Sequence, residues 1–282
     1  MEPFKNFLQL LRLSHWSKSI FVLLGLFYSQ DGKFLVPALL AALAFCLISS
    51  AVYIYNDIED RTEDRLHPHK RHRPLAAKKV SQTDAFLIMF VLLIIGLSLG
   101  WLVSKPLAVL LSIYLLVNVA YNHGLKVIPL LDVSCIAIGF MLRVLAGTVG
   151  IGLPISGWLT VTATLLSLFI ALNKRRLELQ LGLTHSTRKV LTNYHPQLLY
   201  WAILSTGFGC FLTYLFYSIY AHTESFYFIL TLPFAAIALW RFAWLTTRNI
   251  ENDDPINVFL NDRLSRVNLY CFITLTLLAL TK

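Results

Sequence analysis

Three aspartates follow a long apolar run, and their spacing suits them to hold a cation. Asp57, Asp60 and Asp64 lie three and four residues apart. If the preceding helix continues, all three carboxylates lie on one face of it. Such carboxylates repel one another unless a cation sits among them, and hard oxygen ligands at this density favour Mg²⁺. We therefore predict a Mg²⁺ site with these three aspartates as ligands and Asn56 as a neutral oxygen donor.

Cationic side chains follow the aspartates in the same loop. Lys70, Arg71 and Arg73 come within ten residues of Asp64. Protein-bound Mg²⁺ usually shares its coordination shell with substrate phosphates, and these cations could neutralise such phosphates. The pattern predicts a metal-dependent diphosphate site in which Asp57 and Asp60 are catalytic. A solvated loop of mixed charge is the alternative interpretation.

Further candidates lie at the ends of apolar segments or inside them. Lys126 follows one such segment, where its ammonium group could reach a phosphate and take part in catalysis; a lysine that only fixes topology is the alternative. Asp132 and Arg143 are eleven residues apart, so they share a helix face but lie ~16 Å apart along its axis. An arginine inside a span is costly and faces a cavity or a partner, which favours phosphate binding over a structural salt bridge. The predicted substrate-binding residues are Lys18, Asn56, Lys70, Arg73, Tyr121, Lys126, Asp132, Arg143, Lys174 and Arg175.

The composition is that of an integral membrane protein. The chain is 57% hydrophobic and 14% charged, whereas soluble domains are about 25% charged. Apolar segments of about 17–25 residues, the length that spans hydrocarbon, recur along it. We predict a single all-α domain, 1–282, with about nine transmembrane helices around a cytoplasm-facing cavity. The predicted spans are 17–30, 35–56, 84–103, 106–122, 130–150, 156–173, 198–220, 226–245 and 265–281.

The distribution of basic residues predicts the orientation. With the N-terminus inside, 20 of the 24 lysines and arginines are cytoplasmic and only Lys33, Lys105 and Lys282 lie outside. The positive-inside rule then places the N-terminus and the candidate site in the cytoplasm. No cleavable signal peptide is expected, because no small-residue cleavage site follows the first apolar run.

The same bias accounts for the net charge. Membrane topology and anionic substrates explain a charge of +9, so no nucleic-acid partner is expected. The four cysteines all lie in apolar segments without metal-type spacing. We interpret them as small buried apolar residues.

The NDxxDxxxD pattern from Asn56 to Asp64, followed by KxxRP ending at Pro74, resembles the first aspartate-rich motif of the UbiA superfamily of intramembrane prenyltransferases. The segment RLSHWSK and the nine-span layout extend the resemblance over nearly the whole chain. Ordinary members carry a second motif, DxxxD, after the sixth span, which binds a second Mg²⁺ for prenyl diphosphate. Here that loop reads NKRRLELQLGLTHSTRKVL and contains no aspartate.

On this point the chain is similar to the decaprenyl-phosphate phosphoribosyltransferase branch of the superfamily. The similarity lies in HPHKRHRPLAA, YNHGLKVIPLLDVSCIAIGFMLRVLAG, KRRLELQL and DDP…LNDR. It implies transfer of 5-phosphoribose from phosphoribosyl diphosphate (PRPP) to a polyprenyl phosphate at the bacterial plasma membrane, for cell-envelope glycan precursors.

The basic residues of this loop are consistent with the substrates of that branch. These substrates bring three anionic groups into one cavity, where Lys174, Arg175 and Arg176 replace an acidic motif. The acceptor phosphate, with a second pKa of about 6, is already a nucleophile, so no general base is required.

Two other functions are compatible with parts of the pattern. A conventional prenyltransferase acting on an aromatic or other apolar acceptor would share the fold and the first motif, but would need another source for its second metal site. A transporter or a catalytically silent scaffold could use the charged cavity as an anion pathway. Against this, acids and bases cluster on the predicted cytoplasmic side. Membrane lipids are expected partners, and homo-oligomerisation is left open.

Overall fold

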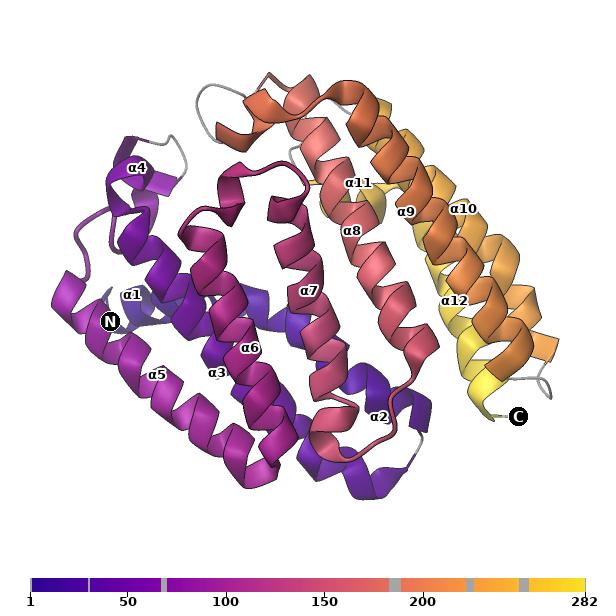
Figure 1. The fold of residues 1–282 in the computed structure, drawn as a ribbon, viewed down its shortest axis with the longest axis horizontal. Coiled ribbons are helices and arrows are strands. Elements are labelled where there is room, and N and C mark those ends of the chain that lie inside the picture. The colour runs from indigo at the N-terminus through magenta and orange to yellow at the C-terminus, as the bar shows by residue number, and fades with distance from the viewer. Residues whose placement is uncertain are drawn as a thin grey trace. The chain divides into compact units, whose positions relative to one another are not determined.

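The computed structural model describes residues 2–29, 31–66, 70–182, 189–221, 226–248 and 254–281, and helices are the regular structure in this part of the chain (Figure 1). Eight of its helical segments are long and apolar enough to cross a membrane. The predicted all-α architecture is confirmed. The eight segments are Gly32–Glu59, Gln82–Val103, Lys105–Asn122, Leu131–Ile151, Gly157–Gln180, Pro196–Tyr220, Phe226–Arg248 and Arg263–Leu280.

The first predicted span, 17–30, is not among these eight segments. It falls in a 3₁₀ helix, η1 (Leu13–Leu23), followed by the short helix α2 (Leu24–Ser29). Serine hydroxyls in η1 form local bonds, as when Ser17 Oγ donates to the Ser14 carbonyl oxygen at 2.9 Å. Such bonds compete with regular α-helix. The described residues therefore contain eight candidate spans where the sequence predicted nine.

The chain divides into two compact units. Helix α7 (Leu131–Ala146) contributes residues to both. The single domain expected over 1–282 stays a prediction. Unit 1 comprises Met1–Leu125 and Leu142–Ile155, and unit 2 comprises Lys126–Met141 and Ser156–Lys282.

Unit 1 is built around helix α3, which packs against α5 and α6 as Figure 1 shows. Small residues permit the close approach of α3 and α5. A Cβ added at Gly96 of α5 would lie 2.8 Å from the Ile48 side chain of α3. The elements of unit 1, besides η1 and α2, are α1 (Glu2–Leu11), η2 (Gly32–Phe34), α3 (Leu35–Glu59), α4 (Arg61–Leu66), η3 (Lys70–His72), α5 (Gln82–Val103), α6 (Lys105–Asn122) and η5 (Val149–Ile151).

The N-terminal helix is fixed to one end of α3. Leu10 and Leu11 of α1 are buried in a cluster with Ala51, Ile54 and Ile58 of α3. Burying apolar side chains in this way stabilises the contact. The junction between α1 and η1 therefore lies beside the C-terminal end of α3.

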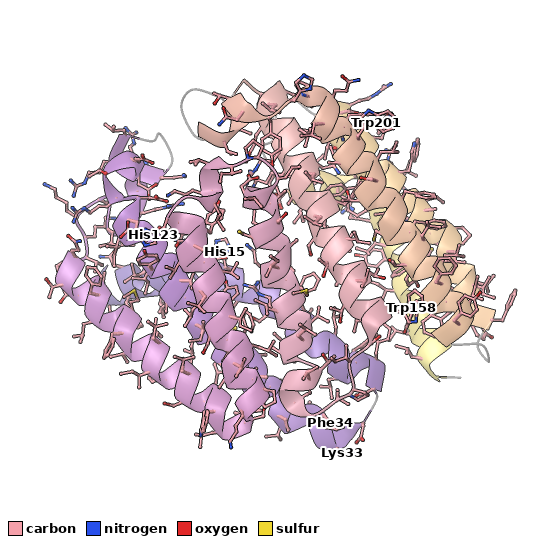
Figure 2. All side chains as sticks on the ribbon, in the orientation of Figure 1. His15, Lys33, Phe34, His123, Trp158 and Trp201 are labelled. Carbon is pink, nitrogen blue, oxygen red and sulfur yellow. The ribbon has the colours of Figure 1, made fainter. Side chains whose placement is uncertain are left out.

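Unit 2 is a helical bundle in which α8 packs against α9 and α10 packs against α12. Its core includes Val133, Phe169, Leu172, Leu191 and Leu199. Figure 2 shows Trp158 and Trp201, near the starts of α8 and α9, at opposite ends of the bundle, as expected for antiparallel neighbours. Its elements, with η4 (Leu125–Val127) at the boundary, are α8 (Gly157–Gln180), η6 (Lys189–Asn193), α9 (Pro196–Phe216), η7 (Tyr217–Ala221), α10 (Phe226–Arg248), α11 (Pro255–Asn261) and α12 (Arg263–Thr281).

Candidate active site

The aspartate motif lies where α3 ends and the chain turns. Helix α3 ends at Glu59, and the N–H of the C-cap residue Asp60 donates to the Asn56 carbonyl oxygen at 2.9 Å. Helix α4 begins at Arg61, and the N–H of Asp64 donates to the Asp60 carbonyl oxygen at 2.8 Å. The helix therefore does not continue through all three aspartates, which was the condition for their sharing one face, but is interrupted at Asp60. The break separates Asp57 on α3 from Asp64 on α4, and a tertiary contact reunites their carboxylates.

Arg73 joins these two carboxylates. Its Nη1 atom donates to Asp57 Oδ1 at 3.0 Å and to Asp64 Oδ2 at 2.7 Å. Lys70 Nζ lies 3.9 Å from Asp64 Oδ1. Asp57 and Asp64 are both buried. Buried carboxylates require counter-ions, and the predicted basic residues Lys70 and Arg73 supply them.

Arg12 is a further member of this group, and the sequence prediction did not include it. Its Nη2 donates to Asp57 Oδ1, and its guanidinium lies over the Tyr53 ring, 5.1 Å from the centroid. Arg12 has a φ of 51°, a left-handed conformation that is uncommon outside glycine. It allows the chain to turn from α1 into η1 beside α3. We call Arg12, Asp57, Asp64, Lys70 and Arg73 the acid–base cluster.

Polar residues from α6 and η1 adjoin the same end of α3. Asn122 Nδ2 donates to Asn56 Oδ1, and Tyr55 Oη lies 3.0 Å from His123 Nε2. Figure 2 shows His123 at the end of unit 1 opposite Lys33, which lies near the start of α3. The predicted residue Lys18 donates from Nζ to Tyr53 Oη at 3.4 Å. The acid–base cluster and its polar neighbours therefore occupy one end of unit 1.

The oxygen atoms present fit Mg²⁺, although no three His, Cys, Asp or Glu side chains among the described residues lie close enough to form a metal centre. Asp57 and Asp64 converge on a single cationic nitrogen of Arg73, so their carboxylates already meet where a cation is required. These two carboxylates are hard oxygen donors, to which Mg²⁺ would add water and substrate phosphate. Asn56 Oδ1 accepts from Asn122, and its predicted ligand role stays a prediction. The ligand role predicted for Asp60 stays a prediction.

The other predicted binding residues divide between the two units. Tyr121 is half-buried near the end of α6 in unit 1, and Lys126 is half-buried in η4, in unit 2. Lys174 is half-buried near the end of α8. The substrate-binding roles of these three residues stay predictions.

Asp132 and Arg175 form a buried network in unit 2. Arg175 Nε donates to Asp132 Oδ2 at 2.7 Å, and Arg175 Nη1 donates to Glu178 Oε2 at 2.7 Å. Tyr194 Oη donates to Asp132 Oδ1 at 2.6 Å and accepts from the Leu130 N–H at 3.0 Å. Burial and the bond to Asp132 raise the pKa of Tyr194, so its phenol stays a neutral donor. We call Asp132, Arg175, Glu178 and Tyr194 the buried network.

The neighbouring Arg176 is also bonded inside unit 2. Its Nη2 donates to Asn173 Oδ1 at 2.6 Å and to Thr246 Oγ1 at 2.7 Å. Two of the three consecutive cations, Arg175 and Arg176, therefore have protein partners. Helix α8 continues through them to Gln180 because those partners satisfy the charged side chains.

Arg143 is buried within unit 1. Its Nη2 donates to Ser49 Oγ at 3.3 Å and to Tyr114 Oη at 3.2 Å. The guanidinium carbon lies 4.8 Å from the Phe45 ring centroid and 5.0 Å from that of Tyr114. A polar and aromatic enclosure of this kind offsets the cost of a buried cation. Arg143 and Asp132 belong to different units, and the phosphate-binding role of Arg143 stays a prediction.

Comparison with known proteins places the chain in one family. A sequence model of the UbiA prenyltransferase family matches residues 19–262. A protein named y4nM from Sinorhizobium fredii is 31% identical over 93% of this chain, and the chain spans only about half its length, 54%. The decaprenyl-phosphate phosphoribosyltransferase of Mycolicibacterium smegmatis is 32% identical over 80% of this chain and 75% of its own length. The enzyme of the same name from Mycobacterium tuberculosis is 29% identical over 90% and 87%.

Solved structures share the fold. A digeranylgeranylglyceryl phosphate synthase superposes with a TM-score of 0.76 over 99% of both chains at 17% identity. A UbiA homologue from Archaeoglobus fulgidus, bound to GPP and Mg²⁺, gives a TM-score of 0.71 over 96% of this chain and 99% of its own at 16% identity. The family model matches most of the chain, and the helices have the family's arrangement. The chain is therefore a multi-pass membrane protein that belongs to the UbiA prenyltransferase family.

Proposed function

We propose that this protein transfers 5-phosphoribose from PRPP to a polyprenyl phosphate and releases diphosphate, with Mg²⁺ as cofactor. The observation that carries the proposal is the acid–base cluster, in which two buried carboxylates are held by three cationic side chains that reach solvent. Such a site can bind a cation and a polyanion together. The relatives named decaprenyl-phosphate phosphoribosyltransferase support the choice of substrates.

The proposed roles follow from position and charge. Asp57, Asp60 and Asp64, with Asn56, would hold Mg²⁺, which would neutralise charge on the leaving diphosphate. Lys70 and Arg73 would bind the donor's phosphate groups, and Arg12 joins them because it shares the Asp57 carboxylate. Lys18, Tyr121, Lys126 and Lys174 are proposed to complete substrate binding.

The chemistry needs positioning more than proton transfer. An oxygen of the acceptor phosphate attacks the anomeric carbon of the ribose, the new C–O bond forms, and the bond to the diphosphate oxygen breaks. The acceptor is nucleophilic near neutral pH, so the protein's tasks are to align the two substrates and stabilise the departing charge. The basic bias of the loops supports a cytoplasmic site in a bacterial plasma membrane, where PRPP would be accessible.

A conventional prenyl transfer is the second candidate, because the family is named for it and A. fulgidus homologues are described with bound GPP or DMAPP and Mg²⁺. The sequence from Asn173 to Tyr194 contains no aspartate for a second metal site. The absence of this acidic motif favours the phosphoribosyl donor.

The decisive experiment offers purified protein both donors. Protein in nanodiscs with Mg²⁺ receives PRPP and a polyprenyl phosphate in one reaction, and geranyl diphosphate with aromatic acids in the other. Mass spectrometry of the lipid fraction should detect a phosphoribosyl lipid in the first reaction only. A prenylated product in the second reaction, with none in the first, would establish the conventional activity.

A further inference from the structure

Helices α10 and α12 of unit 2 border a groove of about 330 Å³ that is separate from the acid–base cluster. Ile237 and Ala238 of α10, with Val267 of α12, contribute to its apolar lining. Arg241, Arg263 and Ser265 form a polar end. The groove thus has an apolar part and a cationic part, as a lipid has tails and a headgroup.

The groove opens on a face that meets the membrane. Both bordering helices are candidate spans. Trp240 and Leu264 on its rim are 61% and 64% exposed, and Ile237 and Val267 are exposed as well. Large apolar residues exposed on a membrane helix face the hydrocarbon of lipids. A membrane lipid therefore has direct access to the groove.

The polar end carries an excess positive charge. Arg241 donates from Nε and Nη2 to both carboxylate oxygens of Asp262, at 3.1 and 2.9 Å. These bonds hold the pKa of Asp262 well below its usual range, so that acid stays ionised and neutralises Arg241. Arg263 is exposed, and among the described residues it has no hydrogen-bond or ion-pair partner. One guanidinium at the mouth of the groove is therefore available to an anion.

We propose that this groove binds an anionic glycerophospholipid, with its phosphate on Arg263 and an acyl chain along Ile237, Ala238 and Val267. Basic pockets between membrane helices on the cytoplasmic side are suited to anionic headgroups. The charge bias predicts that this end of α12 is cytoplasmic. The apolar lining favours a lipid over a soluble anion, which could use only the Arg263 end.

The chain offers a matched control for the test. Arg266 is also exposed on α12, three residues further on, but it does not line the groove. Native protein, Arg263→Gln and Arg266→Gln are purified in detergent and titrated with phosphatidylglycerol, while native mass spectrometry counts bound lipid. Arg263→Gln should weaken phosphatidylglycerol binding about fivefold, the factor that corresponds to ~1 kcal/mol for one basic residue near an anionic headgroup. Arg266→Gln should bind like the native protein.

Two further measurements, with other ligands and with a variant that fills the groove, test whether the ligand is an anionic lipid in this groove. Phosphatidylcholine should bind native protein more weakly than phosphatidylglycerol, and soluble glycerol phosphate should not bind at the same concentrations. Ala238→Trp, which fills the groove, should lower phosphatidylglycerol binding without changing the unfolding midpoint in lipid-free detergent. Equal losses in Arg263→Gln and Arg266→Gln, equal binding of the two lipids, or saturable binding of glycerol phosphate would each overturn the proposal.

Discussion

The acid–base cluster of unit 1 and the buried network of unit 2 are built from the same kinds of residue but differ in the exposure of their cations. In the first, the Asp57 side chain is 2% exposed, while its partners Arg12 and Arg73 are 18% and 27% exposed. In the second, Arg175 is 2% exposed and Asp132 is completely buried. Arg175 is therefore bonded to side chains of the protein and has almost no contact with solvent.

This difference in exposure indicates that the two clusters use their charges for different purposes, one for binding and one for stability. A buried ion pair must be matched by its own partners, because an unpaired charge in that position is very costly. Arg175 cannot bind a substrate without losing its bonds to Asp132 and Glu178. Arg12 and Arg73 reach solvent, so an arriving phosphate can bind them, provided that Mg²⁺ takes their place at the buried carboxylates. We infer that the acid–base cluster serves binding and that the buried network holds α7, α8 and Tyr194 together.

Replacing Arg175 should produce the largest effect. Arg175→Gln leaves the Asp132 and Glu178 carboxylates buried without their cation, so we expect the free energy of unfolding to fall by about 3–5 kcal/mol. Chemical unfolding in detergent, without substrates, measures this. Lys174→Gln is the control, because its side chain is only half-buried, and it should lose less than about 1 kcal/mol. If Arg175→Gln is as stable as the native protein and only binds substrate poorly, the inferred structural role is wrong.

Replacing Asp57 should mainly affect turnover. Asp57→Asn removes a proposed Mg²⁺ ligand but keeps the shape of the side chain, so kcat/KM should fall at least ~100-fold, about 2.7 kcal/mol of transition-state stabilisation. Glu59→Gln is the control, since Glu59 is exposed on the same turn of α3, and it should retain activity. Native turnover by Asp57→Asn, or undiminished turnover in EDTA, would remove the metal site from the proposed function.

Arg143 tests whether a buried cation in unit 1 has a structural role, as we infer for Arg175 in unit 2. Its bonds to Ser49 and Tyr114 and its position against two rings favour a structural role over phosphate binding. Arg143→Lys cannot reproduce this geometry, so stability without substrate should fall by about 2 kcal/mol. Arg266→Lys on the exposed face of α12 should change nothing. A tenfold rise in the KM for PRPP with unchanged stability would restore the phosphate-binding role.

The spans were predictable because their physical signal is local. A membrane helix needs a long apolar run, and helices such as α3, α5 and α10 begin and end within three residues of the apolar runs that predict them. Helix α8 was predicted to end at Asn173, before three cations, but it continues to Gln180. Partners for those cations, Asp132 and Thr246, come from distant parts of the sequence. No local pattern reveals them.

The acid–base cluster was also predictable only where its signal is local in the sequence. Asp57, Asp64, Lys70 and Arg73 lie within one short motif, so their grouping at one site was predicted. The direct contacts of Lys70 and Arg73 with the aspartates were not predicted, because the sequence assigned these cations to substrate phosphates. Arg12 was missed because its contact with Asp57 joins residues 45 positions apart and depends on a left-handed turn at Arg12 itself. A signal was available in that Arg12 begins the RLSHWSK segment. Only the packing of α1 on α3 turns that segment toward the aspartates.

Arg73 provides the smallest and most direct test of whether the acid–base cluster can exchange partners. Its Nη1 atom occupies the point where the Asp57 and Asp64 carboxylates converge, so without substrate it competes with a divalent cation for them. Arg73→Gln should therefore tighten Mn²⁺ binding, measured by electron paramagnetic resonance, by about tenfold, or ~1.4 kcal/mol. The same variant should bind PRPP more weakly, since a phosphate ligand is lost. Arg71→Gln, an exposed neighbour, should change neither affinity. Weaker Mn²⁺ binding by Arg73→Gln, together with native PRPP affinity, would mean that Arg73 is a fixed structural link like Arg175, and the distinction between the two clusters would fail.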